Sequence, residues 1–142
     1  MAKPMKTSTA ITTATGSFEI RSWDEQPYAE LEGAPRLTNA RVTAEHTGDI
    51  DGERTASMVM CYRSDQEATY VGFERVTGSL GGRTGSFVLQ SSGAYVDGAA
   101  TTTWSVVPGS ATGELAGLRG EGGYVAQHGE GTVSCRLDYH FE

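Results

Sequence analysis

Lysine is absent from the chain after Lys6, and Cys61 and Cys135 are its only cysteines. A phosphate-binding Walker loop requires a lysine inside a glycine-rich turn, so this class of nucleotide site is excluded. The two cysteines and three histidines are scattered, without the close pair of ligands that identifies a zinc site. We therefore expect no metal and no cofactor. We interpret the two cysteines as free, buried thiols, with a disulfide between them as the alternative.

Long apolar runs are also absent. No segment approaches the roughly 18 apolar residues that a membrane-spanning helix requires. Lys3 and Lys6 are followed by a threonine-rich stretch that is too polar for the core of a signal peptide. These features predict a cytoplasmic protein without a membrane partner, whose residues 1–12 form a flexible N-terminus.

The charge balance is acidic. The 142 residues include 11 Lys or Arg and 18 Asp or Glu, which gives a formal net charge of −7. Such a chain has no electrostatic attraction to a phosphate backbone, so nucleic acid is not an expected partner. The length suits one domain, which we place at residues 13–142. A hydrophobic content of 37% is enough for a core, while 19 glycines disfavour long helices.

Turn-forming pairs recur at intervals of about a dozen residues, for example Asp51-Gly52, Gly81-Gly82 and Asp97-Gly98. The segments between them are rich in Val, Thr, Phe, Tyr and Trp, and none keeps a helical period. The pattern predicts an all-β protein with strands at residues 13–23, 36–47, 54–63, 68–80, 83–96, 99–107, 113–126 and 131–141. Short connections favour an antiparallel meander that closes into an eight-stranded β-barrel. A β-sandwich is the alternative.

Several segments alternate between apolar and polar residues, as a strand with one buried face does. In the last strand Val133, Cys135, Leu137, Tyr139 and Phe141 share one face. Met58, Met60 and Tyr62 share a face of the third strand. In the first strand we expect Phe18 and Ile20 on one face and Glu19, Arg21 and Trp23 on the other.

The central hairpin departs from this alternation because residues 70–76 and 86–90 carry apolar side chains on both faces. A two-residue turn at Gly81-Gly82 pairs Glu74 with Leu89 and Phe73 with Gln90. Two apolar faces predict a core on one side and a second subunit on the other, so we expect a homo-oligomer through strands 68–96. The acidic segment 24–35 is expected to be a long loop, either a binding loop or a solvated excursion.

Four segments together resemble a known family. They are residues 15–28 (TGSFEIRSWDEQPY), 73–90 (FERVTGSLGGRTGSFVLQ), 104–120 (WSVVPGSATGELAGLRG) and 137–141 (LDYHF). They are similar to the bacterial domain-of-unknown-function family 3224. The resemblance implies a closed barrel like that of the plant allene oxide cyclases and an oligomer, but no assigned reaction.

One local similarity to the cyclases concerns Glu19. The run Glu19-Ile20-Arg21 followed by Pro27 is similar to the cyclases' Glu-Ile-Asn followed by Ser-Pro, but Arg21 stands at the Asn position and no Ser precedes Pro27. The resemblance therefore implies only Glu19 as a candidate ligand-binding residue.

An eight-stranded barrel is either filled by side chains or holds one small ligand. For a pocket, the candidate ligand-binding residues are Glu19, Met58, Met60, Tyr62, Gln90 and Trp104. Glu74, in mid-strand among apolar neighbours, is the candidate catalytic acid or base. The alternative for Glu74 is a structural ion pair with an arginine of an adjacent strand or subunit. Gln90 has the alternative of a buried structural amide, and Trp104 that of a core residue. His46 is expected to be solvated next to the Gly48 turn, with a general base at the strand end as the alternative.

Two functions are consistent with these residues. In the first, the barrel binds a small apolar molecule and cyclises or isomerises it without a cofactor, by confining a reactive conformer. In the second, the barrel is a filled, non-catalytic structural or interaction module. The interior volume distinguishes the two.

Overall fold

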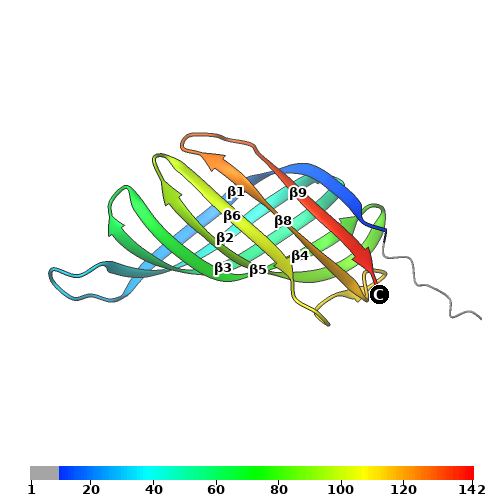
Figure 1. Cartoon of the computed structure of the whole chain (residues 1–142), viewed down its shortest axis with the longest axis horizontal. Coiled ribbons are helices and arrows are strands. Elements are labelled where there is room, and N and C mark those ends of the chain that lie inside the picture. Colours follow the sequence, from blue (N-terminus) through cyan, green and yellow to red (C-terminus); the bar gives the residue numbers. More distant parts are fainter. Residues whose placement is uncertain (1–9) are drawn as a thin grey trace, which may run out of the picture.

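The computed structural model describes residues 10–142, which form an all-β structure (Figure 1). Its strands are β1 (Thr12–Ala29), β2 (Arg36–Gly48), β3 (Ile50–Ser64), β4 (Glu67–Leu80), β5 (Arg83–Val96), β6 (Ala99–Val106), β7 (Thr112–Gly113), β8 (Leu118–Gln127) and β9 (Val133–Phe141). Within this part of the chain, no helix is long and apolar enough to cross a membrane. Residues 1–9 of the predicted N-terminal segment lie outside the described residues, and Thr12 already belongs to β1.

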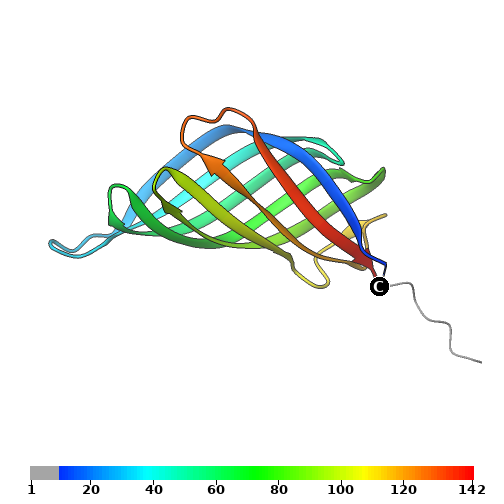
Figure 2. The ribbon, with the colours of Figure 1, turned by 45° about the horizontal axis from the view of Figure 1, so that its top comes forward.

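The strands close into the predicted eight-stranded antiparallel barrel. Successive strands pair as a meander from β1 to β6 and then through β8 to β9, and the ring closes where β9 pairs with β1 (Figure 2). The predicted strand 113–126 is divided. Its first residue belongs to the short β7, which pairs with β5, and β8 begins only at Leu118. Turns occupy the residues between them, and there Leu115 is fully buried.

The turn at Gly81-Gly82 sets the register of the central hairpin as predicted, with Glu74 opposite Leu89 and Phe73 opposite Gln90. Both glycines have positive φ angles, of 57° and 86°, which suits a two-residue hairpin turn. The inner face of β9 also has the predicted set of residues, from Val133 to Tyr139.

β1 differs from the prediction in two ways, and both shape the cavity. The β1–β2 register shifts by one residue between Ile20 and Ser22, so a β-bulge at Arg21 changes which face the following residues occupy. Trp23 therefore lies opposite the buried Val42 and on the same face as Ile20, not on the opposite face as expected. Sequence alternation assumes an unbroken pleat and does not reveal the bulge.

The first half of the predicted loop 24–35 is strand. β1 continues to Ala29, and Pro27 lies opposite Thr38 of β2. In this outer half β1 pairs with β2 alone, since its pairing with β9 ends at Phe18. A proline is tolerated there because an edge strand does not use every backbone N–H. Figure 1 shows the resulting long hairpin extending beyond the barrel.

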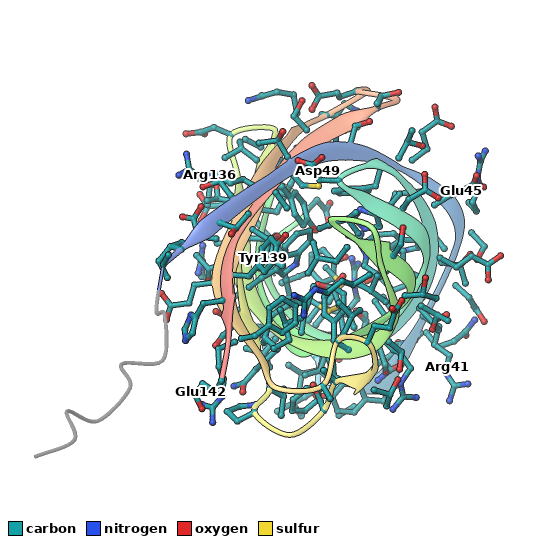
Figure 3. All side chains as sticks on the ribbon, turned by 90° about the vertical axis from the view of Figure 1, so that its right-hand side faces the viewer. Arg41, Glu45, Asp49, Arg136, Tyr139 and Glu142 are labelled. Carbon is teal, nitrogen blue, oxygen red and sulfur yellow. The ribbon has the colours of Figure 1, made fainter. Side chains whose placement is uncertain are left out.

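The two ends of the barrel differ. At the end that carries the C-terminus, large apolar side chains fill the interior, namely Ile50, Leu80, Phe87, Leu115, Leu118, Leu137 and Tyr139. Figure 3 looks into this end and shows Tyr139 directed inward, whereas Arg41, Glu45 and Arg136 point away from the barrel. A smaller cluster around Met58, Met60 and Tyr70 lies toward the other end, where the barrel is hollow.

Candidate functional site

A cavity of about 400 Å³ occupies the barrel half near the β3–β4, β5–β6 and β8–β9 turns. Its walls are mainly apolar and come from all eight strands of the barrel. The lining includes Phe18, Ile20, Trp23, Val42, Ala56, Met58, Met60, Tyr62, Ala68, Tyr70, Tyr95, Ala100, Tyr124, Ala126 and Val133. The charged side chains in the wall are Arg54, Asp65, Glu74 and Glu130. The cavity opens at the end of the barrel that the large apolar side chains do not fill, opposite the end that carries the C-terminus.

Glu74 and Arg54 form a buried ion pair at the inner end of this cavity. Arg54 Nε lies 3.0 Å from Glu74 Oε1, with both side chains at most 4% exposed. The N–H is not directed at that oxygen, so the contact is chiefly Coulombic. Trp104 Nε1 donates to Glu74 Oε2 across 2.7 Å, and Ser91 Oγ donates to the same oxygen. The carboxylate is thus fixed by three neighbouring groups.

Arg54 is held from its other side by rings and by His46. Its guanidinium carbon lies 4.1 Å from the ring centre of Phe18, and Nη1 lies 3.1 Å from His46 Nε2. A guanidinium can only donate, so Nε2 of His46 accepts and the imidazole proton resides on Nδ1. Burial, together with the positive charge of Arg54, lowers the pKa of His46 to about 3. His46 is therefore neutral and buried, not solvated as expected.

The thiol of Cys135 completes this inner layer, 3.9 Å from Nδ1 of His46. Burial raises the pKa of Cys135 to about 11, so the thiol stays protonated and is a poor nucleophile. Cys61 and Cys135 are both free, as predicted, but only Cys135 is buried, and Cys61 is half-buried.

Tyrosine hydroxyls supply the neutral polar groups of the wall. Tyr70 Oη lies 2.6 Å from Thr102 Oγ1, and burial raises the pKa of Tyr70 to about 12. Gly93 makes this position possible, because a Cβ there would lie 2.7 Å from the Tyr70 hydroxyl. The phenol is protonated at neutral pH, and its hydroxyl is held by Thr102 and by the carbonyl oxygen of Thr101.

Near the mouth, Glu25 holds two aromatic wall residues in place. Its carboxylate accepts hydrogen bonds from Tyr62 Oη at 2.6 Å and from Trp23 Nε1 at 2.9 Å, and a third from Thr38. Burial opposes ionisation of Glu25, but these hydrogen bonds and the charge of Arg36 outweigh it and lower the pKa. Burial and the Glu25 carboxylate raise the pKa of Tyr62 to about 12.

The structure brings together Met58, Met60, Tyr62 and Glu74 of the candidate residues, all in the cavity wall. Trp104 lies behind the wall, fully buried in the core, and reaches the cavity only through its hydrogen bond to Glu74. The proposed ion pair of Glu74 with an arginine of an adjacent strand is present, and Arg54 of β3 is that arginine.

Glu19 and Gln90 do not reach the cavity, which corrects their expected placement. Glu19 lies on the outer face, where its carboxylate is 3.4 Å from Arg21 and accepts a hydrogen bond from Thr132. Gln90 is exposed on the outer face of β5, since its neighbours Leu89 and Ser91 take the inner positions. Alternation of side chains along β1 and along β5 places Glu19 and Gln90 on the outer face of the barrel.

Arg54, Tyr70, Tyr95 and Tyr124 are wall residues that the sequence analysis did not select. Alternation places Tyr70 on the face of Glu74, and Arg54 on the face of Met58. Alternation therefore indicated the inner face for Tyr70 and for Arg54. Only the pairing of the strands shows that both residues line the same cavity. Among residues 10–142, no group of three His, Cys, Asp or Glu side chains is arranged to hold a metal ion.

The fold and the cavity define a small, closed, antiparallel β-barrel with one filled and one hollow end. Residues 14–139 match the model of a family described as "Protein of unknown function (DUF3224)", and the chain belongs to this family. No curated protein matches the chain. The similarity to the allene oxide cyclases stays a prediction.

A solved structure supports the same fold. It is the crystal structure of a protein with unknown function from the DUF3224 family of Shewanella oneidensis MR-1. The two chains are 30% identical and superpose with a TM-score of 0.76, over 94% of this chain and 99% of the other.

Proposed function

We propose that this barrel binds a small, mainly apolar molecule in its hollow end. One observation carries the proposal: an apolar cavity of about 400 Å³ that contains a few fixed polar groups. Such a volume falls within the range of roughly 300–1,000 Å³ that is typical of small-molecule sites. The tyrosine hydroxyls and the Glu74–Arg54 pair supply the polar groups that orient a ligand.

The choice of small residues at inward positions favours binding over a filled structural barrel. Ala56, Ala68, Ala100 and Ala126 all line the cavity. Leucine or phenylalanine at these positions would occupy space that the chain leaves open, as they do at the other end. Filling such space normally stabilises a core, so a hollow half is the arrangement expected of a ligand site.

A second function, cyclisation or isomerisation of the bound molecule, is supported by the position of Glu74. Its carboxylate is the acidic group at the inner end of the cavity, and ring closure inside a confining wall needs few catalytic groups. The three contacts of Glu74 fix its geometry, as a general base or an electrostatic stabiliser requires.

Native mass spectrometry of the protein purified from its own host tests the binding proposal, since a bound small molecule adds its mass to the folded protein. Titration with the neutral fluorescent probe N-phenyl-1-naphthylamine gives an independent measurement. We expect Ala100→Phe, which fills the cavity, to abolish probe binding. Thr101→Phe is the matched control, because Thr101 is the next residue of β6 and is exposed on the outer face. Equal probe affinity in both variants contradicts the proposal.

Glu74→Gln tests the catalytic extension with the molecule that co-purifies. We expect slower conversion with the affinity largely kept. If both conversion and affinity equal those of the unmodified protein, Glu74 is not part of the site.

A further inference from the structure

The cavity has an excess of negative charge. Its charged lining consists of the carboxylates Asp65, Glu74 and Glu130 and the single guanidinium of Arg54. Arg54 is already paired with Glu74 and packed on Phe18, so the lining offers no free cation to an anionic ligand. A negatively charged group that entered the cavity would lose its hydration without gaining a partner.

Two of the carboxylates lie at the mouth. Asp65 belongs to the turn between β3 and β4, and Glu130 to the turn between β8 and β9. Within residues 10–142 neither carboxylate forms an ion pair, and Glu130 accepts only the backbone N–H of Gln127. Both side chains are exposed, and the two turns that carry them lie on opposite sides of the ring of strands.

Aromatic rings form much of the wall between these acids and the inner end. They are Phe18, Trp23, Tyr62, Tyr70, Tyr95 and Tyr124. Ring faces carry negative electrostatic potential and attract ammonium and guanidinium groups. Three rings of this wall already attract an arginine: Arg54 lies 4.1 Å from the ring centre of Phe18 and 5.8 Å from that of Tyr124, and Arg36 lies 4.4 Å from that of Tyr62.

We infer that the ligand is a cationic amphiphile: an apolar body that fills the cavity and an amino or quaternary ammonium group that lies at the mouth. This inference rests on the proposed binding function and names the ligand class for the same cavity. The apolar body takes the place between Met58, Met60 and the alanines. The cationic group lies near Asp65 and Glu130 and against the rings of the mouth.

Three probes with the same apolar body and different charge test the inference: octyltrimethylammonium, 1-octanol and octanoate. Their dissociation constants are measured by isothermal titration calorimetry at pH 7 and low salt. We expect octyltrimethylammonium to bind about tenfold more tightly than 1-octanol, and octanoate to bind most weakly. In 1 M NaCl the advantage of the ammonium probe should shrink because salt screens exposed charges.

The double variant Asp65→Asn/Glu130→Gln should lose most of the ammonium advantage and keep its affinity for 1-octanol. Asp97→Asn is the matched control, because Asp97 lies in the β5–β6 turn at the same end but does not line the cavity. Asn tolerates the positive φ of 53° at this position. The control should keep the full advantage.

The outcomes separate the two proposals. If octanoate equals or exceeds the ammonium probe, or if the double variant keeps the full advantage, the ligand class is wrong while binding stands. If none of the three probes binds, 1-octanol included, and Ala100→Phe leaves the affinity for N-phenyl-1-naphthylamine unchanged, the proposed binding function is wrong.

Discussion

Arg54 Nε and Glu74 Oε1 lie 3.0 Å apart inside the barrel, and each side chain is at most 4% exposed. Removing two opposite charges from water is costly, and their attraction offsets that cost only while both are present. Each residue of the pair therefore stabilises the fold only when the other is present.

Replacing one member of this pair should cost far more than replacing both. Arg54→Met leaves the Glu74 carboxylate buried and unpaired, so we expect the free energy of unfolding in urea to fall by about 3–5 kcal/mol. The double variant Arg54→Met/Glu74→Leu should recover most of that loss. Arg63→Met, which breaks the exposed pair with Glu67, should change stability by less than about 1 kcal/mol. A double variant as unstable as the sum of its single variants contradicts the prediction.

His46 should make the protein less stable as the pH falls. Its pKa is about 3 in the folded protein against an ordinary value of 6.5, so between these values the unfolded chain binds a proton that the folded chain does not. Stability is then fully present above pH 6.5 and declines below it, by up to about 1.4 kcal/mol per pH unit. Urea unfolding at pH 7 and pH 5 measures this loss.

His46→Gln should remove most of the slope between pH 7 and pH 5, whereas His128→Gln, at an exposed position, should keep it. Glu25 and Asp138 also have lowered pKa values, but they add a loss of stability only below about pH 4.5. An imidazole resonance of His46 that titrates near pH 6.5 in NMR spectra would overturn the assignment of a neutral, buried ring.

Gly93 should tolerate no side chain. A Cβ at this position would lie 2.3 Å from the carbonyl oxygen of Thr101 and 2.7 Å from the Tyr70 hydroxyl. We expect Gly93→Ala to destabilise the protein by about 1–3 kcal/mol and to weaken probe binding, since Tyr70 lines the cavity. At Gly131 no atom lies within 4 Å of a Cβ, so Gly131→Ala should leave thermal stability and probe affinity unchanged. Equal melting temperatures of the two variants would count against this packing role of Gly93.

The outer face of the central strands should mediate self-association. Val59, Val71 and Phe73 are adjacent on this face, and Phe73 is 57% exposed in the single chain. Such an apolar surface is typical of an interface, and we expect light scattering with size-exclusion chromatography to give a mass above the 15.1 kDa of one chain. Phe73→Glu should reduce the mass to that of the monomer. Val125→Glu, on the exposed face of β8, should not. A monomeric unmodified protein contradicts the prediction.

Much of the fold could be predicted because its signals are local. A Gly-Gly pair takes up the positive φ angles of a tight hairpin turn, and this fixes the partners of Glu74 and Phe73 without knowledge of any other strand. Strict alternation in residues 133–141 assigns the inner face of β9 for the same reason. The candidate site could be predicted in part, since Met58, Met60 and Tyr62 follow one strand face.

The other features depended on which segments meet in space. The bulge at Arg21 turned Trp23 inward, and the single-sided pairing of outer β1 let Pro27 stay in a strand. His46 is buried because Phe18, Arg54 and Trp104 surround it, and these come from three other strands. These contacts join residues that are far apart in the sequence, so no short segment of it could reveal them.

The sequence by itself determined an acidic, antiparallel β-protein with few reactive groups, because composition, turn residues and alternation act over short distances. Only the tertiary structure decided that one end of the barrel is filled and the other hollow. Closure of the ring sets which inward side chains share a layer. In this chain it places leucines and aromatic residues together at one end, and alanines, methionines and tyrosines around a cavity at the other.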